Sequence, residues 1–255
     1  MSGKWRPRPP YRPAVRGAIF GSMTNPTKTV LIIGASRGLG YAMAEEYLKQ
    51  GWSVVGTVRG EGANPFRELA AKSDGRVEIE TLDINFPDQI AAVRARLEGR
   101  AFDLLFVNAG VGNARPNATT AEVTDEEFTT LMVTNALSPM RVVEALQDLV
   151  PPTGVIGVMS SGQGSVANNT VGMREVYRAS KAALNTLMRS FAARHAEGPR
   201  AMVLMAPGWV RTDMGGPDGK LSIEQSVPNL VNVLLKKKGN PGLEYLDYLG
   251  QTVPW

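Results

Sequence analysis

A short apolar run, followed at once by a glycine-rich turn and a helical pattern, constrains the fold of this chain most. The run Lys28 to Ile33 is rich in β-branched residues, as is typical of a strand buried on both faces of a parallel sheet. Glycines recur in the turn 34–40, and an amphipathic helix is predicted over Leu39 to Gln50, closed by Gly51. This order predicts the first unit of an α/β domain.

Strand and helix patterns alternate along the rest of the chain. Further strands are predicted at Ser53 to Val58, Val77 to Thr81, Phe102 to Val107, Val155 to Ser160, Ala201 to Ala206 and Leu243 to Leu246. A long helical stretch is predicted over Asp125 to Leu149. The alternation predicts a doubly wound parallel sheet of seven strands with helices on both faces. With 255 residues and 43% hydrophobic content, the chain is long enough for one large domain.

The positive charge is concentrated at the beginning of the chain. The first 22 residues hold Lys4, Arg6, Arg8, Arg12 and Arg16 and no acidic residue. Removing these five from the 28 basic residues leaves 23 against 24 acidic ones, so the remaining chain is nearly neutral. The high isoelectric point is therefore no sign of a nucleic-acid partner. Four prolines accompany the basic residues, and we predict that residues 1–26 are a disordered extension ahead of a domain at 27–255.

Composition also limits the environment of the protein. No apolar run approaches 18 residues, so we expect no membrane span. The chain has no cysteine, which excludes disulfides and thiolate chemistry. Its only histidine, His195, is not a credible metal ligand by itself, and no metal site is expected. Nothing favours secretion, and we expect a cytoplasmic protein.

The glycine turn has the composition of a phosphate-binding loop. Glycines where a strand turns into a helix let backbone amides approach a pyrophosphate, and the helix N-terminus favours an anion. Gly34, Gly38 and Gly40 are spaced by three residues and then one, which differs from the usual G-x-G-x-x-G pattern of dinucleotide-binding folds. An ordinary tight turn is the alternative.

Two arginines bear on the choice of nucleotide. Arg59 follows the predicted strand 53–58, where a dinucleotide-binding fold places the residue that contacts the adenosine ribose. Together with Arg37 it offers two guanidinium groups, which suit the 2′-phosphate of NADP. Glu61 could instead bind the free hydroxyl of NAD, but it falls beyond the strand end. We therefore predict NADPH or NADP, with NAD less favoured; two merely solvated arginines are the alternative.

Tyr177 and Lys181 lie one helical turn apart. At an i,i+4 spacing both side chains lie on one face of a helix, where an ammonium favours the phenolate form of a phenol. A tyrosine with a pKa lowered in this way can pass a proton to a carbonyl oxygen near neutral pH. The same pair is common on solvated helix faces, so its meaning depends on the other motifs.

With these motifs the sequence resembles the short-chain dehydrogenase/reductase family from Thr27 onward. The matching pieces are the turn 34–40, Leu82-Asp83-Ile84, Asn108-Ala109-Gly110, Asn135, Ser161, Tyr177 with Lys181, and Pro207-Gly208. The residues around Tyr177 resemble the C-factor-like and sniffer-like carbonyl reductase branch. The resemblance implies a single Rossmann domain that acts on a small carbonyl or alcohol substrate.

The resemblance also implies a role for each catalytic residue. Tyr177 protonates the carbonyl oxygen, while Lys181 lowers the pKa of that tyrosine and donates to the nicotinamide ribose. Ser161 orients the substrate and stabilises the developing alkoxide. Asn135 holds a water that connects Lys181 to solvent. Sixteen positions separate Ser161 from Tyr177, more than is common in the family, which predicts an extra bulge between them.

Two neighbouring serines, Ser160 and Ser165, remain alternatives to Ser161. The cofactor-binding set implied by the resemblance is Gly34, Ser36, Arg37, Gly38, Leu39, Gly40, Arg59, Asp83, Ile84, Asn108, Ala109, Gly110, Tyr177, Lys181, Pro207, Gly208, Val210 and Thr212. In that set Asp83 and Ile84 meet the adenine, and Val210 and Thr212 meet the nicotinamide.

Two functions of different classes follow. The first is an NADPH-dependent oxidoreductase that reduces a ketone or aldehyde, or oxidises the alcohol. The second is a nucleotide-binding sensor or signalling protein of the same fold with little turnover. The loop Gly162 to Arg174 is the expected source of specificity, and Trp209 either faces the substrate or packs. The resemblance leaves the oligomeric state open between monomer, homodimer and homotetramer, and implies no nucleic-acid or membrane partner.

Overall fold

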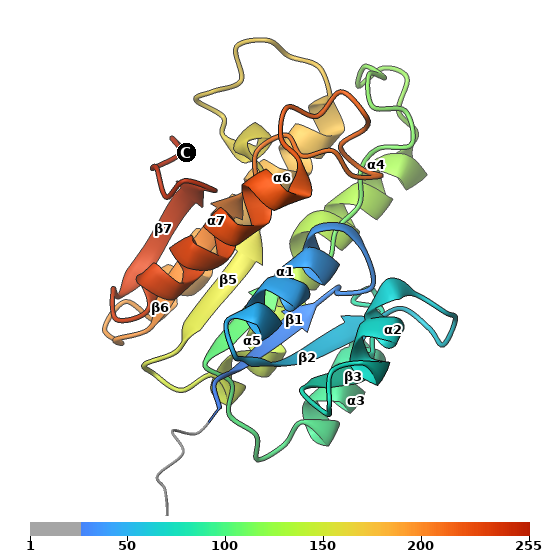
Figure 1. Cartoon of the computed structure of the whole chain (residues 1–255). Helices are drawn as coiled ribbons and strands as arrows, with labels where there is room; N and C mark the ends of the chain where they lie inside the picture. The colour runs from blue at the N-terminus through green and yellow to red at the C-terminus, as the bar shows by residue number, and fades with distance from the viewer. Residues whose placement is uncertain (1–26) are drawn as a thin grey trace, which may run out of the picture.

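Seven parallel strands form one sheet in the order β3-β2-β1-β4-β5-β6-β7. The computed structural model describes residues 27–255 (Figure 1), and the predicted extension 1–26 lies outside them. The strands are β1 Thr29–Ile33, β2 Ser53–Val58, β3 Val77–Thr81, β4 Leu104–Val107, β5 Val155–Met159, β6 Ala201–Ala206 and β7 Gly242–Asp247. Each pair of neighbours is parallel. The predicted doubly wound sheet of seven strands is confirmed.

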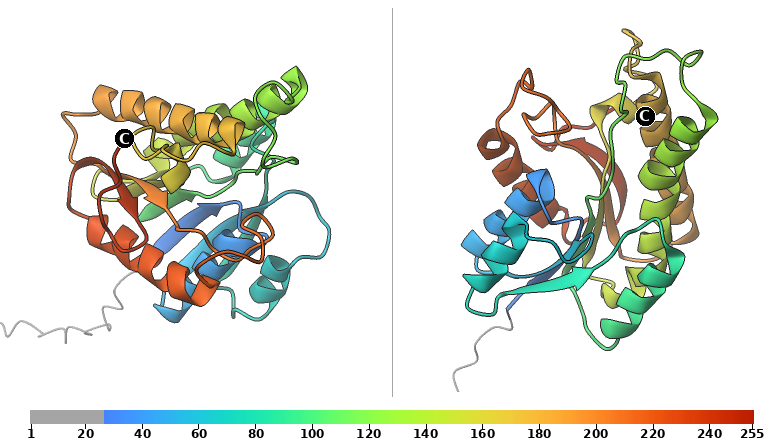
Figure 2. Two further views of the ribbon diagram at one scale, coloured as in Figure 1. Left: turned by 90° about the horizontal axis from the view of Figure 1, so that it is seen from above. Right: turned by 90° about the vertical axis from the view of Figure 1, so that its right-hand side faces the viewer.

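Helices cover both faces of the sheet (Figure 2). One face carries α1 Gly38–Lys49, α2 Pro65–Ala71 and α7 Ile223–Lys237. The other carries α3 Pro87–Arg96, α4 Asp125–Met132, α5 Ser138–Leu146 and α6 Glu175–Arg194. The single Rossmann domain implied by the resemblance is therefore present in the described residues.

Each central strand is buried on both sides, as its continuous apolar run predicts. In β1, Leu31 and Ile33 belong to the hydrophobic cluster beneath α3, α5 and α6. Val30 and Ile32 point the opposite way, into the cluster beneath α1, α2 and α7. Alternate side chains of one strand thus enter two separate cores, which fixes the sheet between the helical layers.

The helical stretch predicted over 125–149 is interrupted. Between α4 and α5 the backbone forms a π-helical segment, η1 Val133–Leu137, and α5 is followed by a short 3-10 turn, η2 Gln147–Leu149. Pro139 lies in the first turn of α5 and has no N–H to donate to the carbonyl of Asn135, four residues earlier. The missing donor explains why the helix widens at Asn135, which pattern reasoning did not foresee.

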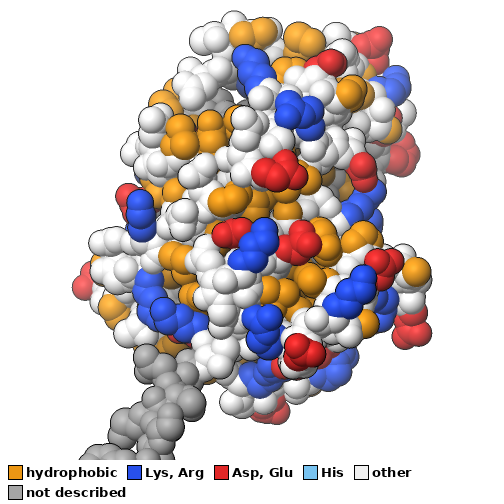
Figure 3. Space-filling model, in the orientation of Figure 1, with side chains coloured by type: hydrophobic (Ala, Val, Ile, Leu, Met, Phe, Trp, Pro, Cys, Tyr) orange, Lys and Arg blue, Asp and Glu red, His pale blue; other side chains and the backbone are white. Residues whose placement is uncertain are grey.

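The described surface carries charges of both signs. Figure 3 shows acidic and basic side chains interspersed over one face, with hydrophobic side chains exposed between them. Of the helices within residues 27–255, none combines the length and the apolar character needed to cross a bilayer.

Candidate active site

A cavity of about 560 Å³ opens at the carboxyl ends of the strands. It lies where β1 and β4 are neighbours and the winding of the sheet changes direction, the place where doubly wound folds bind ligands. Eighteen of the twenty predicted site residues line it. The exceptions are Gly40 and Asn135, which lie behind its wall.

The glycine turn forms one end of the cavity. Gly34 has a φ of 89° and Gly38 a φ of 57°, a left-handed backbone that glycine adopts without strain. A Cβ at Gly40 would lie 2.0 Å from the carbonyl oxygen of Gly34, so this helical glycine lets α1 pack on the turn. No side chain caps the N-terminus of α1, which leaves its first amides free to bind an anion.

The two predicted phosphate-binding arginines line the same end. Arg59 is exposed and has no ion pair within the described residues. Arg37 donates from Nη1 to Asp213 Oδ2 at 2.9 Å, in an exposed pair that joins the glycine turn to the loop after β6. Glu61, the alternative ribose ligand, is exposed and does not line the cavity.

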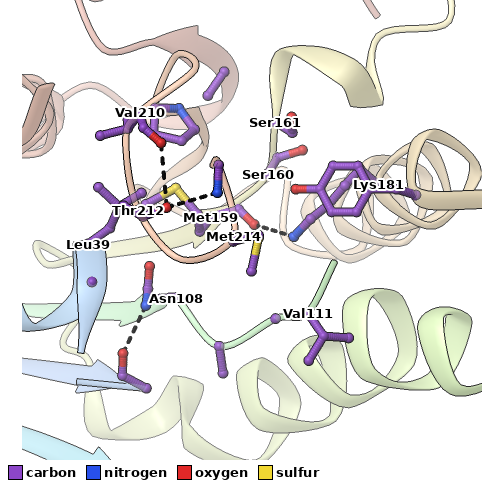
Figure 4. Close-up of a pocket in the computed structure, with 18 of the residues that line it drawn as sticks. Leu39, Asn108, Val111, Met159, Ser160, Ser161, Lys181, Val210, Thr212 and Met214 are labelled. Carbon is purple, nitrogen blue, oxygen red and sulfur yellow. Dashed lines mark hydrogen bonds between the residues drawn. The ribbon is translucent and has the colours of Figure 1, made fainter. Parts of the chain in front are cut away.

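Tyr177 and Lys181 lie at the other end, on one face of α6. Both side chains are buried, and Lys181 Nζ is 5.9 Å from the centre of the Tyr177 ring. Nζ donates to the carbonyl oxygen of Met159 at 3.0 Å, the contact drawn from Lys181 in Figure 4. Burial lowers the pKa of Lys181 to about 8.

The pKa of Tyr177 differs from the prediction. Burial raises it, while a hydrogen bond with Ser161 and the nearby charge of Arg174 act in the lowering direction. Burial of the phenol is therefore the largest effect on this pKa, and Lys181, which was expected to lower it, is not among the groups that do so. Sequence reasoning did not identify the cation at Arg174, since it is three residues before Tyr177 and belongs to a loop.

The three candidate serines have different surroundings. Ser161, just beyond β5, is the one whose hydroxyl interacts with Tyr177. Ser160 is buried and donates from Oγ to Asn185 Oδ1 at 2.6 Å. Ser165 is buried outside the cavity wall, and its Oγ accepts from the N–H of Asn168 at 3.1 Å. Ser160 and Ser161 both line the cavity, and of the three serines only Ser161 interacts with the Tyr177 hydroxyl.

Asn135 is buried in the π-helical segment, and both ends of its amide are hydrogen-bonded. Oδ1 accepts from the N–H of Val111 at 2.8 Å, and Nδ2 donates to the Val111 carbonyl at 2.9 Å and to Ser180 Oγ at 3.1 Å. The side chain therefore holds the segment after β4 against α6. A Cβ at Gly110 would lie 3.2 Å from Oδ1, so only glycine leaves this contact undisturbed.

The segment between Ser161 and Tyr177 takes up the extra residues in two turns. A 3-10 turn, η3 Gly162–Gly164, begins the loop, and the Ser161 hydroxyl accepts from the N–H of Gln163 at 3.1 Å. Three consecutive left-handed residues, 172 to 174, end it directly before α6.

The sequence and the fold are both similar to those of known proteins. The family model described as short chain dehydrogenase matches residues 28–220. The chain belongs to this family. A solved short-chain dehydrogenase/reductase from Burkholderia multivorans with bound NADP is 63% identical, with a TM-score of 0.89 over 90% of this chain and 100% of that one.

Two further relatives are similar over most of their length. A carbonyl reductase from Pseudomonas aeruginosa PAO1 in complex with NADP is 36% identical, with a TM-score of 0.83 over 90% of this chain and 100% of that one. The protein C-signal of Myxococcus xanthus is 35% identical over 155 residues, which are 60% of this chain and 92% of that protein. The predicted family and its carbonyl reductase relatives are thus confirmed.

In this short-chain dehydrogenase the loop after β6 closes one side of the cavity. Thr212 Oγ1 accepts from the N–H of Gly215 at 3.1 Å (Figure 4), and Trp209 Nε1 donates to the Gly215 carbonyl at 2.7 Å. The Trp209 ring is 46% exposed and lines the cavity, so it faces the mouth and does not pack in the core. Val210 also lines the cavity, beside Thr212.

Side chains near β3 order the end of the cavity where the adenine is predicted to lie. Asp83 Oδ1 accepts from the N–H of Asn85 at 3.0 Å, and the Asp83 N–H donates to Gln89 Oε1 at 2.8 Å. Ile84 is buried against the core, and Asn108 Nδ2 donates to the Gly34 carbonyl at 2.8 Å. Asn108 thereby ties the end of β4 to the glycine turn. Among the described residues no cluster of three His, Asp or Glu side chains could hold a metal ion.

Proposed function

We propose that this short-chain dehydrogenase binds NADP(H) and interconverts a ketone or aldehyde with its alcohol, with Tyr177 as general acid and base. The observation that carries the proposal is one continuous cavity with the glycine turn at one end and Tyr177, Lys181 and Ser161 at the other. Such a cavity can hold a dinucleotide so that its reactive ring lies beside a proton donor.

The residues at the glycine turn suit the phosphates of the nucleotide. The uncapped N-terminus of α1 offers backbone amides, and the left-handed turn at Gly34 lets a pyrophosphate approach them. Arg59 and Arg37 provide guanidinium groups for a 2′-phosphate, with Arg37 exchanging Asp213 for the nucleotide. Two relatives hold NADP in their structures, which supports the same nucleotide here.

The chemistry divides between the nucleotide and the protein. When bound as NADPH, the cofactor supplies the hydride that the carbonyl carbon accepts. Tyr177 gives its phenolic proton to the carbonyl oxygen, and Ser161 donates a hydrogen bond to the same oxygen as negative charge develops. In the reverse direction Tyr177 takes the alcohol proton.

Lys181, which lines the cavity, and Asn135, which lies behind its wall, support this step. With a pKa of about 8, Lys181 is largely an ammonium at neutral pH, and its remaining donors can bind the nicotinamide ribose. Asn135 keeps the segment at Val111 and Gly110 close to Lys181, which positions the floor of the cavity. The alternative, a sensor or signalling protein, is suggested by the similarity to C-signal; it would explain a nucleotide-binding cavity but requires none of these proton-transfer groups.

The test measures NADPH oxidation with a panel of ketones and aldehydes. We expect Tyr177→Phe to lower kcat by a factor of about 10² to 10⁴, because the proton donor is lost, while the Kd for NADPH stays within about threefold. The matched control is Tyr41→Phe, since that hydroxyl is bonded to Glu45 on α1 and the residue does not line the cavity.

Two results would refute the proposal. Wild-type protein that binds NADPH tightly and oxidises it with none of the carbonyl compounds would favour the sensor. A Tyr177→Phe variant with the wild-type kcat would exclude Tyr177 as the proton donor.

A further inference from the structure

Arg174 is a cation in the wall of the active-site cavity that the proposed reaction does not use. It directly precedes α6 and lines the cavity with Tyr177. Its guanidinium carbon lies 5.3 Å from the centre of the Tyr177 ring, so the charge stands over the face of the proposed proton donor. Lys181, the other cation near this ring, is 5.9 Å from the same centre and is bonded to Met159.

The backbone holds Arg174 in an unfavourable conformation. Gly172, Met173 and Arg174 have φ values of 69°, 60° and 54°, and the last two carry side chains that disfavour the left-handed region. Arg178 Nε donates to the Met173 carbonyl at 2.8 Å, which ties this turn to α6. Such backbone conformations cost free energy and are held in place by the surrounding structure. They cluster at active sites and ligand-binding sites.

The guanidinium of Arg174 has no internal acceptor to explain its position. Within residues 27–255 no carboxylate lies within ion-pair distance of it, and its Nε is buried without a hydrogen-bond partner. The neighbouring Glu175 carboxylate accepts from the N–H of Thr120 at 2.8 Å, and Asp213 is paired with Arg37. A buried donor without an acceptor is costly, and a ligand that supplied one would be bound strongly.

Hydrophobic side chains line the cavity near the Arg174 guanidinium. Trp209 and Met214 are each 46% exposed and line the cavity, as does Val111. A ligand here meets a cation next to Tyr177 and hydrophobic side chains toward the mouth.

We propose that Arg174 binds a carboxylate group of the substrate, so that the preferred substrates are oxo acids with the carboxylate a few bonds from the carbonyl. The inference rests on the proposed function and adds to it a substrate class. A guanidinium matches a carboxylate with two parallel hydrogen bonds, and its place over Tyr177 sets the carboxylate close to the carbonyl that Tyr177 protonates.

The test compares 4-oxopentanoate with its methyl ester, which keeps the ketone and removes the charge. Wild-type protein should favour the acid by about tenfold or more in kcat/KM, the effect of one charge-assisted hydrogen bond. In Arg174→Met the ratio should fall to about one, with kcat/KM for the ester within about threefold of wild type. Arg174→Lys should keep part of the preference, because it retains the charge without the two-pronged geometry.

Arg141→Met serves as the control, since Arg141 is an exposed residue of α5 that does not line the cavity. It should leave the ratio unchanged. A wild-type enzyme that prefers the ester, or an Arg174→Met variant that keeps the preference for the acid, would overturn the inference. If Arg174→Met does not fold, Arg174→Lys provides the test. The inference is overturned if this variant has the wild-type acid-to-ester ratio and the wild-type affinity for hexanoate.

A binding measurement separates this inference from the proposed function. Hexanoate carries a carboxylate but no ketone or aldehyde, and calorimetric titration of the NADP-bound protein reports its affinity without turnover. Hexanoate binding that Arg174→Met weakens about tenfold, in a protein that reduces no carbonyl compound, would support the anion site and refute the reductase. Hexanoate binding that is equal in wild type and Arg174→Met would refute the anion site alone.

Discussion

Arg37 in the glycine turn and Arg59 at the end of β2, the two residues proposed to select the nucleotide, differ in their present partners. Arg59 stands exposed beside the cavity without an ion pair in the described part of the chain, whereas Arg37 is held by Asp213. Removing Arg59 therefore takes away a group already free to meet a phosphate, while Arg37 has to give up a partner first. Because both members of the Arg37 pair are exposed, exchanging it costs little.

We expect Arg59→Asp to shift the ratio of kcat/KM for NADPH to that for NADH toward NADH by about tenfold to a hundredfold. A carboxylate repels the 2′-phosphate and can accept from the free ribose hydroxyls of NADH. Steady-state kinetics with both nucleotides measure the ratio, and Lys72→Asp, at an exposed position outside the cavity, controls for charge reversal. A ratio equal to that of wild type would contradict the assignment.

At the scale of whole elements, the site depends on how closely α1 packs on the turn that precedes it. The approach of Gly40 to the Gly34 carbonyl and to Asn108 Nδ2, 2.6 Å from a Cβ built on Gly40, leaves no room for a methyl group. On the opposite layer, the π-helical segment brings Asn135 under the end of β4. The close packing at Gly40 and the π-helical segment at Asn135 each set the distance between a helix and the end of a strand.

Gly40→Ala should push α1 away from the turn. We expect the free energy of unfolding to fall by about 1–3 kcal/mol through overpacking, and the Kd for NADPH to rise about tenfold or more because the first amides of α1 move. Urea unfolding and fluorescence titration measure the two effects. Gly62→Ala is the matched control, because a Cβ there meets nothing within 4 Å. Wild-type NADPH affinity in Gly40→Ala would show that the close packing is not needed.

Across the whole molecule, the order of the sheet brings the last strand to the active site. β7 lies beside β6, which lies beside β5, and Tyr245 of β7 donates from its hydroxyl to the Ser161 carbonyl. Tyr245 is almost fully buried, and this contact ties the loop after β5 to a residue 84 positions away in sequence.

Tyr245→Phe should therefore loosen Ser161. We expect kcat for carbonyl reduction to fall about three- to tenfold, and the free energy of unfolding to fall by about 1 kcal/mol from the lost hydrogen bond. Tyr47→Phe is a contrasting control, because the buried Tyr47 hydroxyl has no partner and its removal should not destabilise the protein. Equal unfolding midpoints and equal kcat for Tyr245→Phe and wild type would contradict this role.

Much of the architecture could be predicted because it depends on local patterns. The residue patterns of β2, β3 and β6 predicted those strands with the bounds observed, and the glycine turn predicted the start of α1 within one residue. The predicted strands 102–107 and 155–160 are longer than β4 and β5. Phe102 and Ser160 lie just outside these strands but are buried like strand residues. An apolar run in the sequence predicts which residues are buried, and buried residues continue beyond the last backbone hydrogen bond of a strand.

The sequence by itself determined the seven strands, the presence of helices on both faces of the sheet and the family motifs, because hydrophobic periodicity and glycine conformation act between neighbouring residues. Only the tertiary structure decided which serine faces Tyr177, that Asn135 is bonded to Val111, and that Arg174 stands over the tyrosine ring. These contacts join strand ends and loops from different layers. Their geometry depends on how the layers pack, and no local pattern records it.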